Sequence, residues 1–398
     1  MISVQEAVEI IQSNIIEPEL IEVPFYDAVG KVLAEPIAAD RDFPPFNRVM
    51  MDGVAINNEQ YQSGQRLFAI EATQLAGAPQ LELKNVVNCL EVMTGAMLPI
   101  GADTVIRYED VTIEGNKAVI NDIEIKKGQN IHLQGQDIKT KQIIIESNTL
   151  ITPAEMGVIT TVGKNKVKVY KPLKFAIIST GDELVNVEEE PEMYQIRQSN
   201  SHVLRASLDQ LGMVSQVFHI VDKKEELKSR IEKILSEYDV LVLSGGVSKG
   251  KSDFVPEVLE ELGVTKHFHR VAQRPGKPFW FGTIRKKSVF ALPGNPVSTF
   301  LCFNKYILPW LRKSYSLDDN IQLTQLAEDF EFKPDLTYFL QVKVNNDKGM
   351  LKAKPVVGQG SGDLANLVFA DGFLELPANK SNFKAGEVFP YIPYRTSE

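Results

Sequence analysis

The spacing of apolar residues changes several times along the chain, and each stretch predicts its own kind of element. At the start, Ser3 and Glu6 accompany a run from Val4 to Ile11 in which apolar residues recur at helical spacing. A serine followed three residues later by glutamate is the pattern of a capping box, which satisfies backbone N–H groups at the start of a helix. One amphipathic helix is therefore expected to open the protein.

Short apolar runs cut by glycine, proline and asparagine follow, from about residue 32 to residue 139. Runs such as LFAIEA and DTVIRYEDV, separated by turn residues, are typical of an all-β module. A helical stretch returns at residues 149–163, with Thr152 as its N-cap and Glu155 three residues on, and the strand KVKVY follows it. We expect this returning stretch to pack with the N-terminal helix as one discontinuous domain.

Strands and helices then alternate from residue 172 to about residue 316. The expected strands are KFAIIST, QVFHIV, DVLVLS and VFALPGNP, and the expected helices are residues 200–211, 224–237, 253–262 and 296–311. This alternation predicts a parallel sheet with helices on both faces. Beyond residue 317 the runs FLQVKV, MLKAKPVV and GFLELP predict a small C-terminal β barrel or sandwich.

These patterns predict a multidomain α/β plus β protein with a central doubly wound α/β domain. A chain of 398 residues is too long for one compact core, and about two to four domains are expected. The expected boundaries are residues 1–39 with 140–171 for the discontinuous N-terminal domain, 40–139 for the inserted β-rich domain, 172–316 for the α/β domain and 317–398 for the C-terminal β domain.

Composition narrows the class of protein. The net charge is −9, which argues against a surface that binds nucleic acid. The first residues form neither a secretory nor a transit segment, and no apolar run approaches the roughly 20 residues that cross a bilayer. Cys89 and Cys302 each lie inside an apolar segment, as buried thiols of a reducing compartment do. A cytoplasmic enzyme without a membrane partner is expected.

Polar, glycine-rich turns follow three of the predicted strands. They are residues 179–183, residues 244–248 running on to Asp253, and residues 293–296 with Ser298. Ligands of open α/β sheets bind outside the carboxyl ends of the strands, and glycine turns at helix N-termini favour anions. Three such turns at one sheet edge predict a phosphate-binding cleft.

Charged residues near these turns suggest a metal and an anion. Asp182, Glu183, Asp222 and Asp253 are carboxylates of the kind that hold Mg²⁺ together with substrate phosphates, although a helix N-cap explains Asp253 equally well. The loop from Arg274 to Pro278 carries two cations. It could be a solvated surface turn, or it could supply the positive charge that an anionic ligand needs.

Three other motifs are set aside. Residues 245–252 match the P-loop pattern, but in a true P-loop the helix begins near the lysine, and Pro256 would then break it. His267 and His269 share one face of a predicted strand, yet no third metal ligand is near in sequence. No G-x-S-x-G elbow of a serine hydrolase is present.

Eight segments run in order from about residue 40 to residue 365: PPFNRVMMDGVA, MTGAMLPIGAD, GQDI, STGDEL, SGGVS with Asp253, RPGKP, LPGNPVS and GQGS. Together and in this order they resemble the molybdopterin molybdenumtransferases, the MoeA type, to which the E domain of gephyrin also belongs. The resemblance implies four domains, with the α/β domain of the molybdopterin-binding type. It also implies an elongated homodimer whose cleft lies at the domain and subunit junction.

The resemblance implies insertion of molybdenum from molybdate into adenylylated molybdopterin, with AMP released in the presence of Mg²⁺ or Zn²⁺. The adenylyltransferase and recipient molybdoenzymes are candidate partners. Glu183, Asp222 and Asp253 would hold the metal, while Lys277, Ser298 and Ser361, with Arg274 beside them, would hold molybdate or the terminal phosphate. Asp52, Thr94 and Asp137 would reach the cleft from the partner subunit. The implied catalytic group is Asp52, Thr94, Asp137, Glu183, Asp253 and Lys277; the remaining binding positions are Thr180, Gly181, Ser244, Gly245, Gly246, Ser248, Pro293, Gly294 and Asn295.

Two departures from the family stand out. An arginine of the C-terminal domain that helps to bind molybdate is missing from residues 330–345, where Gln341 and Lys343 are nearest. Arg274 stands where the family often has lysine, which keeps the charge. Alternatives are a catalytically weak paralogue, a scaffold like the gephyrin E domain, or the molybdopterin adenylyltransferase, which lacks the flanking β domains.

Overall fold

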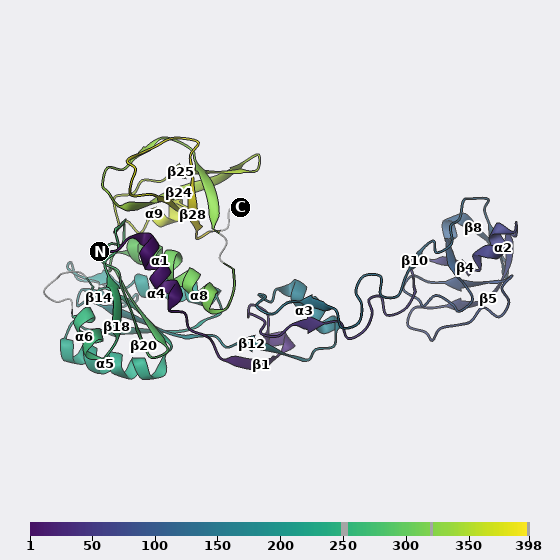
Figure 1. Cartoon of the computed structure of the whole chain (residues 1–398), viewed down its shortest axis with the longest axis horizontal. Coiled ribbons are helices and arrows are strands. Elements are labelled where there is room, and N and C mark those ends of the chain that lie inside the picture. The colour runs from purple at the N-terminus through teal and green to yellow at the C-terminus, as the bar shows by residue number, and fades with distance from the viewer. Residues whose placement is uncertain (248–253, 319–320, 396–398) are drawn as a thin grey trace.

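The computed structural model describes residues 1–247, 254–318 and 321–395. Figure 1 shows an elongated chain, with the α/β region and the C-terminal barrel together at one end and a β module at the other. A smaller segment that carries α3, β1 and β12 lies between them. None of the helices within these ranges is long and apolar enough to cross a membrane.

A six-stranded sheet forms the centre of the α/β region. In sheet order its strands are β16 (Val214–Ile220), β13 (Lys174–Thr180), β17 (Val240–Ser244), β21 (Lys287–Leu292), β20 (Trp280–Ile284) and β18 (Thr265–His269). The first four strands are parallel, as predicted, but β20 runs antiparallel to both of its neighbours. Only Arg285 and Lys286 separate β20 from β21, and parallel strands need a much longer crossover. The sheet is therefore mixed, not purely parallel.

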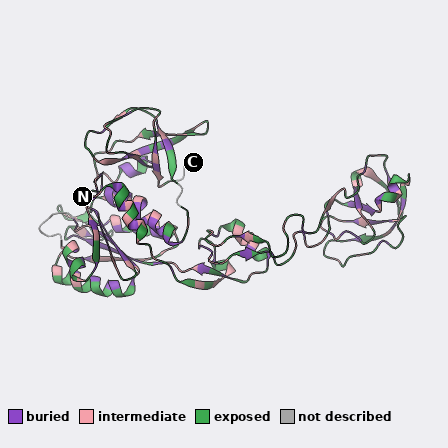
Figure 2. Cartoon of the chain, viewed as in Figure 1, coloured by how far each residue is buried: buried purple, intermediate pink, exposed green. Residues whose placement is uncertain are grey.

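Helices cover both faces of this sheet (Figure 2), and a cluster of buried apolar residues lies on each face. One face carries α5 (Lys224–Glu237), whose predicted bounds are confirmed, and α6 (Val255–Glu261). The other face carries α4 (Asn200–Gln210), α7 (Pro296–Cys302), α8 (Leu308–Ser314) and α1 (Val4–Ser13). Apolar layers on both faces are what a doubly wound sheet requires.

The capping box of α1 is present, but its packing partner differs from the expectation. Ser3 and Glu6 exchange the predicted hydrogen bonds. Val4, Ala7 and Ile11 are buried in the core of the α/β region, and α1 contacts α8. The apolar stripe of a helix is covered by whichever apolar surface fits it, and here the stripe of α1 lies in the core of the α/β region.

The helix expected over residues 296–311 is longer and is interrupted. Between α7 and α8 lies η3 (Phe303–Ile307), a π-helical turn, and α8 continues to Ser314. Pro309 has no N–H to donate to the residue four positions earlier, and its ring would meet that carbonyl in a regular helix. A wider turn just before Pro309 accommodates it.

The segment next to the α/β region is built from two distant parts of the chain. Strand β1 (Leu20–Pro24) pairs with β12 (Lys166–Tyr170), and β2 (Ile37–Ala38) pairs with β11 (Ile143–Ile145). The turn η1 (Phe25–Asp27) and helix α3 (Pro153–Thr161) complete it, and Thr152 and Glu155 form the predicted capping box. Buried residues from both parts form one small core.

The inserted module is the β structure that the sequence predicts. Its six-stranded sheet has the order β7 (Thr104–Arg107), β4 (Gly53–Ile56), β6 (Cys89–Val92), β5 (Leu67–Gln74), β9 (Lys117–Ile120) and β8 (Val111–Glu114). A small sheet pairs β3 (Arg48–Val49) with β10 (Ile131–His132), and α2 (Asn58–Gln62) and η2 (Tyr108–Asp110) connect strands. Two apolar clusters fill this module.

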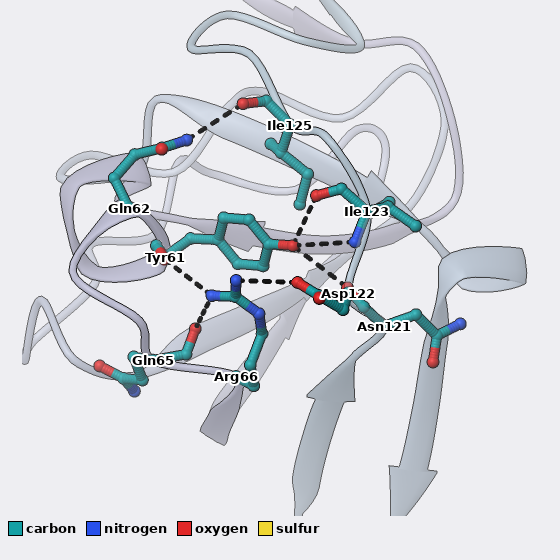
Figure 3. Close-up of polar contacts among 8 residues, drawn as sticks. All are labelled: Tyr61, Gln62, Gln65, Arg66, Asn121, Asp122, Ile123 and Ile125. Carbon is teal, nitrogen blue, oxygen red and sulfur yellow. Dashed lines mark hydrogen bonds and ion pairs between the residues drawn. The ribbon is translucent and has the colours of Figure 1, made fainter.

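A polar cluster fixes α2 to residues 121–125, in the connection between β9 and β10 (Figure 3). The buried Tyr61 hydroxyl donates to the Ile123 carbonyl at 2.7 Å, and the Arg66 guanidinium lies 3.8 Å from the centre of the Tyr61 ring. Arg66 also bonds Asp122 at 3.1 Å. The connection between β9 and β10 is thereby held by side chains where no strand pairing holds it.

The C-terminal region is a closed five-stranded barrel, one of the two forms predicted. Going round the barrel, the strands are β24 (Thr337–Asp347), β25 (Met350–Pro355), β22 (Gln322–Leu326), β28 (Val388–Pro393) and β26 (Gly372–Leu376), and β26 pairs back with β24. The short pair β23 (Phe330–Glu331) with β27 (Asn382–Phe383) and helix α9 (Asn366–Phe369) flank it. Strand β19 (Gln273–Arg274) pairs with β24 and ties the barrel to the α/β region.

Candidate functional site

The three predicted turns meet at one edge of the central sheet. They follow the carboxyl ends of β13, β17 and β21, which are adjacent and in register: Ser179 pairs with Ser244, and Ser244 with Leu292. A Cβ built on Gly294 would stand 3.6 Å from Gly245 Cα, so the second and third turns are in contact. The sequence prediction that these turns share one cleft is consistent with this placement.

Glycine is required in the second turn because the backbone approaches the first turn closely. Gly245 has φ +100°, and a Cβ there would lie 2.8 Å from the Thr180 carbonyl oxygen. Gly246 has φ +67°, and its Cβ would lie 2.9 Å from Thr180 Oγ1. That hydroxyl is buried and has no hydrogen-bond partner among the described residues. A bound ligand could satisfy it.

A cavity of about 580 Å³ opens over these turns, and we call it the turn cavity. Its lining contains most of the predicted binding positions, namely Thr180, Gly181, Ser244, Gly245, Gly246, Pro293, Gly294 and Asn295. It also contains β15 (Ile196–Arg197), which pairs with β14 (Leu184–Val185). Ser248 and Asp253 lie outside the described residues, so their positions relative to this cavity are not described.

Asn200 is a lining residue that the sequence analysis did not single out. It stands at the start of α4, and its amide donates to Ser244 Oγ at 2.8 Å and to the Gly294 carbonyl at 2.7 Å. One side chain thus joins the second and third turns. The residue pair Ser199–Asn200 before a helical run signals a helix start, but nothing local in the sequence points to the two distant turns.

Two carboxylates of the predicted metal set, Glu183 and Asp222, line the turn cavity. The backbone N–H of Asp222 donates to Asp182 Oδ1 at 3.3 Å, which holds the ends of β13 and β16 together. The described lining offers oxygen ligands without histidine or cysteine, a donor set that suits Mg²⁺ better than Zn²⁺. Within the described ranges no three such side chains come together as a complete protein cage.

A second cavity, of about 730 Å³, adjoins the first and lies between the α/β region and the barrel. We call it the cation cavity, because Arg274 and Lys277 line it. Pro293, Gly294 and Asn295 line both cavities, so the two lie side by side at this turn. Neither cation forms an ion pair with a carboxylate in the ranges that the structure describes, which leaves their charge available to an anion.

Hydroxyls from both regions face this second cavity. Ser298 lies in the first turn of α7 and Ser361 in the loop after β25. The Asn295 amide donates to Ser361 Oγ at 2.6 Å, and the N–H of Val297 donates to the Ser361 carbonyl at 3.1 Å. The predicted molybdate-binding residues Arg274, Lys277, Ser298 and Ser361 are therefore brought together, although they come from three separate segments.

Gln341 and Lys343 are the residues nearest to the place where the family has an arginine, and they have different surroundings. Gln341 lines the cation cavity, and its Oε1 accepts a hydrogen bond from Asn366 Nδ2 at 3.1 Å. Lys343 is absent from that lining and pairs with Asp371 at 3.1 Å. A neutral amide, not a cation, therefore occupies the barrel side of the cavity.

Asp52, Thr94 and Asp137 lie on the inserted module and not in either cavity of their own chain. Figure 1 places that module at the opposite end of the chain from the central sheet. Asp52 Oδ1 accepts from the Thr94 backbone N–H at 2.6 Å and from its hydroxyl at 2.7 Å, and these two donors lower the pKa of Asp52. Asp137 bonds His132 at 2.8 Å, a partner that the sequence analysis did not identify.

The two histidines, the two cysteines and Pro256, to which the sequence analysis assigned no role in the site, have ordinary structural contacts. His267 bonds the Thr283 hydroxyl at 2.8 Å and stacks on Phe281, while His269 bonds the Val247 carbonyl at 3.0 Å. Cys89 and Cys302 are buried and free, as predicted, and burial raises the pKa of the Cys89 thiol to about 12. Helix α6 begins at Val255 with Pro256 in its first turn, where proline costs little.

Known proteins resemble the chain over its whole length. Models of the MoeA N-terminal region (domain I and II), of a probable molybdopterin binding domain and of the MoeA C-terminal region (domain IV) match residues 2–163, 176–313 and 324–394. Molybdopterin molybdenumtransferases from Synechocystis and Staphylococcus epidermidis are 43% and 32% identical, over 99% and 98% of this chain and 100% and 95% of theirs.

Solved structures agree with this result. A molybdopterin biosynthesis MoeA protein from Pyrococcus horikosii is 30% identical, with a TM-score of 0.85 over 100% of both chains. A second structure, from Pyrococcus horikoshii OT3, is 27% identical, with a TM-score of 0.83 over 99% of this chain and 100% of that one. With its three regions matched in order, this chain belongs to the molybdopterin molybdenumtransferase family, whose members are transferases of molybdenum cofactor biosynthesis.

Proposed function

We propose that this protein inserts molybdenum from molybdate into adenylylated molybdopterin and releases AMP. The observation that carries the proposal is that the turn cavity and the cation cavity adjoin at Pro293, Gly294 and Asn295, which line both. A nucleotide phosphate and an oxyanion could then occupy neighbouring sites. Holding two reactants in contact removes much of the entropic cost of their reaction.

The turn cavity is the proposed site of the adenylylated end of the substrate. Backbone N–H groups of the glycine turns and the Thr180 hydroxyl are suitable donors to phosphate oxygens. Glu183 and Asp222, with Asp253, would hold Mg²⁺ and, through it, the pyrophosphate. When bound, the ion would offset negative charge on the anhydride oxygens. Zn²⁺ is the less suitable ion for this set of oxygen ligands.

The cation cavity is the proposed molybdate site. A dianionic oxyanion needs fixed donors, and Arg274, Lys277 and Ser298 provide two charges and a hydroxyl. Ser361, already bonded to Asn295, and the Gln341 amide complete the ring of donors from the barrel side. With Gln341 in place of an arginine, one positive charge fewer faces the anion, so weaker molybdate binding is expected than in an arginine-bearing site.

We propose that the active protein is a homodimer with the four domains named above, and that each inserted module serves the partner's cleft. The motivating observation is that Asp52, Thr94 and Asp137 line neither the turn cavity nor the cation cavity of their own chain. Mixing an Asp52→Asn subunit with a Lys277→Ala subunit tests this directly. Mixed dimers should regain part of the activity that each variant lacks, since one cleft in each mixed dimer then has both intact residues. No recovery in proven mixed dimers would contradict the shared site.

The competing functions make different experimental predictions. A scaffold or catalytically weak paralogue would bind the nucleotide without cleaving it. An adenylyltransferase would form the anhydride from ATP. It would not need the two flanking β regions, which in this chain are the inserted module and the barrel. Recipient molybdoenzymes and the adenylyltransferase are the expected partners, in the cytoplasm.

The deciding experiment supplies adenylylated molybdopterin, Mg²⁺ and molybdate to the wild-type protein. AMP release and activation of a cofactor-free molybdoenzyme are both measured. Asp253→Ala and Asp222→Asn should lose both activities, whereas Asp209→Ala should keep them, because Asp209 lies on the exposed side of α4 and pairs only weakly with Arg205 at 3.7 Å. Binding of the nucleotide by the wild type without cleavage or metal transfer would reject the proposed activity in favour of a scaffold.

A further inference from the structure

A buried polar network lies directly beneath the loop that carries Arg274 and Lys277. Its centre is Gln273, which is fully buried. The Gln273 amide nitrogen donates to the Pro275 carbonyl at 3.1 Å and to the Gly276 carbonyl at 3.4 Å. Two consecutive carbonyls of the loop are thus held by one side chain from the strand that precedes it.

The amide of Gln273 is held in turn by Tyr306. The Tyr306 hydroxyl, on the π-helical turn η3, donates to Gln273 Oε1. Tyr306 is 2% exposed, and burial raises its pKa well above the usual range, so the phenol keeps its proton and remains a donor. With its oxygen directed at Tyr306, the amide presents its N–H groups to the loop carbonyls.

Packing leaves the loop no room to shift toward this network. Gly276 has φ +90°, and a Cβ there would lie 2.6 Å from Gln273 Nε2 and 3.0 Å from Cys302 Sγ. Phe279, just beyond the loop, packs against the Tyr306 ring with 4.9 Å between ring centres. The backbone between the two cations therefore rests on a fully packed, hydrogen-bonded support.

A buried amide and phenol are costly unless every polar atom is paired, and an apolar pair of the same size would fill the same space. What the polar pair adds is directional control of the loop. We propose that Gln273 and Tyr306 are positioning residues that set where Arg274 and Lys277 stand in the cation cavity. Neither residue needs to touch the anion. This inference rests on the proposed molybdate site.

Tyr306→Phe is the primary test, because it removes one hydroxyl and leaves the ring in place. The KM for molybdate should rise about fivefold or more, the effect of losing one ordinary hydrogen bond, while kcat stays within about twofold. Amide hydrogen exchange in a peptide covering residues 274–279 should become faster. The matched control is Tyr315→Phe, because Tyr315 is also buried in this helical run but bonds Leu173 and Lys171, away from the cleft.

A second variant, Gln273→Met, should show the same pattern more strongly, since it releases both loop carbonyls. If Tyr306 acts through Gln273, the double variant should be no worse than Gln273→Met alone. Unchanged exchange in the loop, or faster exchange with an unchanged KM, would overturn the inference. A wild-type protein that shows no molybdate-dependent transfer would instead reject the proposed function, and the exchange measurement would still decide whether the network holds the loop.

Discussion

The side-chain amide of Asn295 donates a 2.6 Å hydrogen bond to Ser361 Oγ and so joins a turn of the central sheet to a loop beside the barrel. Both residues line the cation cavity, and Asn295 also lines the turn cavity. The bond therefore crosses the boundary between two regions at the point where the two proposed substrates would meet. The length and direction of this hydrogen bond therefore depend on how the barrel packs against the α/β region.

Replacing Ser361 by alanine should weaken molybdate binding with little loss of stability. The hydroxyl is both a proposed ligand and the acceptor for Asn295, while the bond from Val297 to the Ser361 carbonyl remains. We expect the KM for molybdate to rise about fivefold and the free energy of unfolding to fall by about 1 kcal/mol. Ser381→Ala is the control, because it removes an exposed Asn–Ser bond, from Asn382, elsewhere in the barrel region. Equal effects of the two variants on KM would contradict a role for Ser361.

The Asp52–Thr94 pair predicts a defined pH dependence. Donors from Thr94 lower the pKa of Asp52 below its ordinary value of 3.8. A lowered folded-state pKa means that this carboxylate contributes stability above 3.8, and that the contribution is lost as the pH falls through the folded-state value. Thr94→Val keeps the backbone donor and removes the hydroxyl, so the pKa of Asp52 should rise part of the way back.

Two measurements check this shift. The Asp52 carboxyl can be titrated by NMR in both proteins, and the acid limb of the kcat/KM profile should move to higher pH in Thr94→Val if the Asp52 carboxylate is required for activity. Asp52→Asn, of almost the same size, should then be inactive at every pH. A shifted NMR pKa with an unmoved acid limb would show that Asp52 is structural and not catalytic.

Gln341 should determine the affinity for molybdate. It lines the cation cavity, and its orientation is set by Asn366. Gln341→Arg adds a charged donor and should lower the KM for molybdate several-fold, as one charge-assisted hydrogen bond in place of a neutral one does. Gln341→Leu should raise it. Lys343→Gln, which breaks the pair with Asp371 outside the cavity, should leave the KM unchanged. An arginine variant with an unaltered or higher KM would show that Gln341 does not face the anion.

Local patterns in the sequence predicted local structure well, and long-range packing explains most of what they did not predict. Both capping boxes, at Ser3 and Thr152, form as expected, because their hydrogen bonds span three residues. The burial of α1 against α8 could not be read in this way, since an amphipathic stripe does not specify its partner. The reversal of β20 follows from a short turn at Arg285 that propensity patterns do not resolve.

For the candidate site, too, local signals in the sequence predicted one part and long-range contacts determine the other. The glycine turns were visible because strand ends and turn residues are local signals, and parallel order places them together. Asn200 and Gln273 were missed, because their importance lies in contacts with segments far away in the chain. The distance of Asp52 from the cleft of its own chain depends on the elongated arrangement of the regions. The motif that contains Asp52 does not indicate this arrangement.

Gly245 should be the least replaceable glycine of the site. At φ +100° an alanine is strained, which costs roughly 1–2 kcal/mol. Its Cβ would also press to 2.8 Å from the Thr180 carbonyl oxygen, so the turns would have to move apart. Gly263→Ala isolates the first effect, because Gly263 has φ +82° and its nearest neighbour is 4.0 Å away. Urea unfolding should show the larger loss for Gly245→Ala, with nucleotide binding lost only there; similar losses would mean that close approach is unimportant.

The pair Lys305–Glu375 should hold the barrel against the α/β region. Lys305 Nζ and Glu375 Oε2 are 2.6 Å apart, with side chains only 19% and 20% exposed. Removing one partner leaves the other charge poorly solvated, whereas removing both leaves an apolar contact, which is often no less stable. Glu375→Leu should therefore lower the free energy of unfolding by roughly 2–3 kcal/mol and raise the KM for molybdate as the barrel side of the cavity loosens. The double variant Lys305→Met with Glu375→Leu should recover most of the stability in urea unfolding. A double variant as unstable as the sum of the single ones would show that the two side chains act independently and that their ion pair does not seat the barrel.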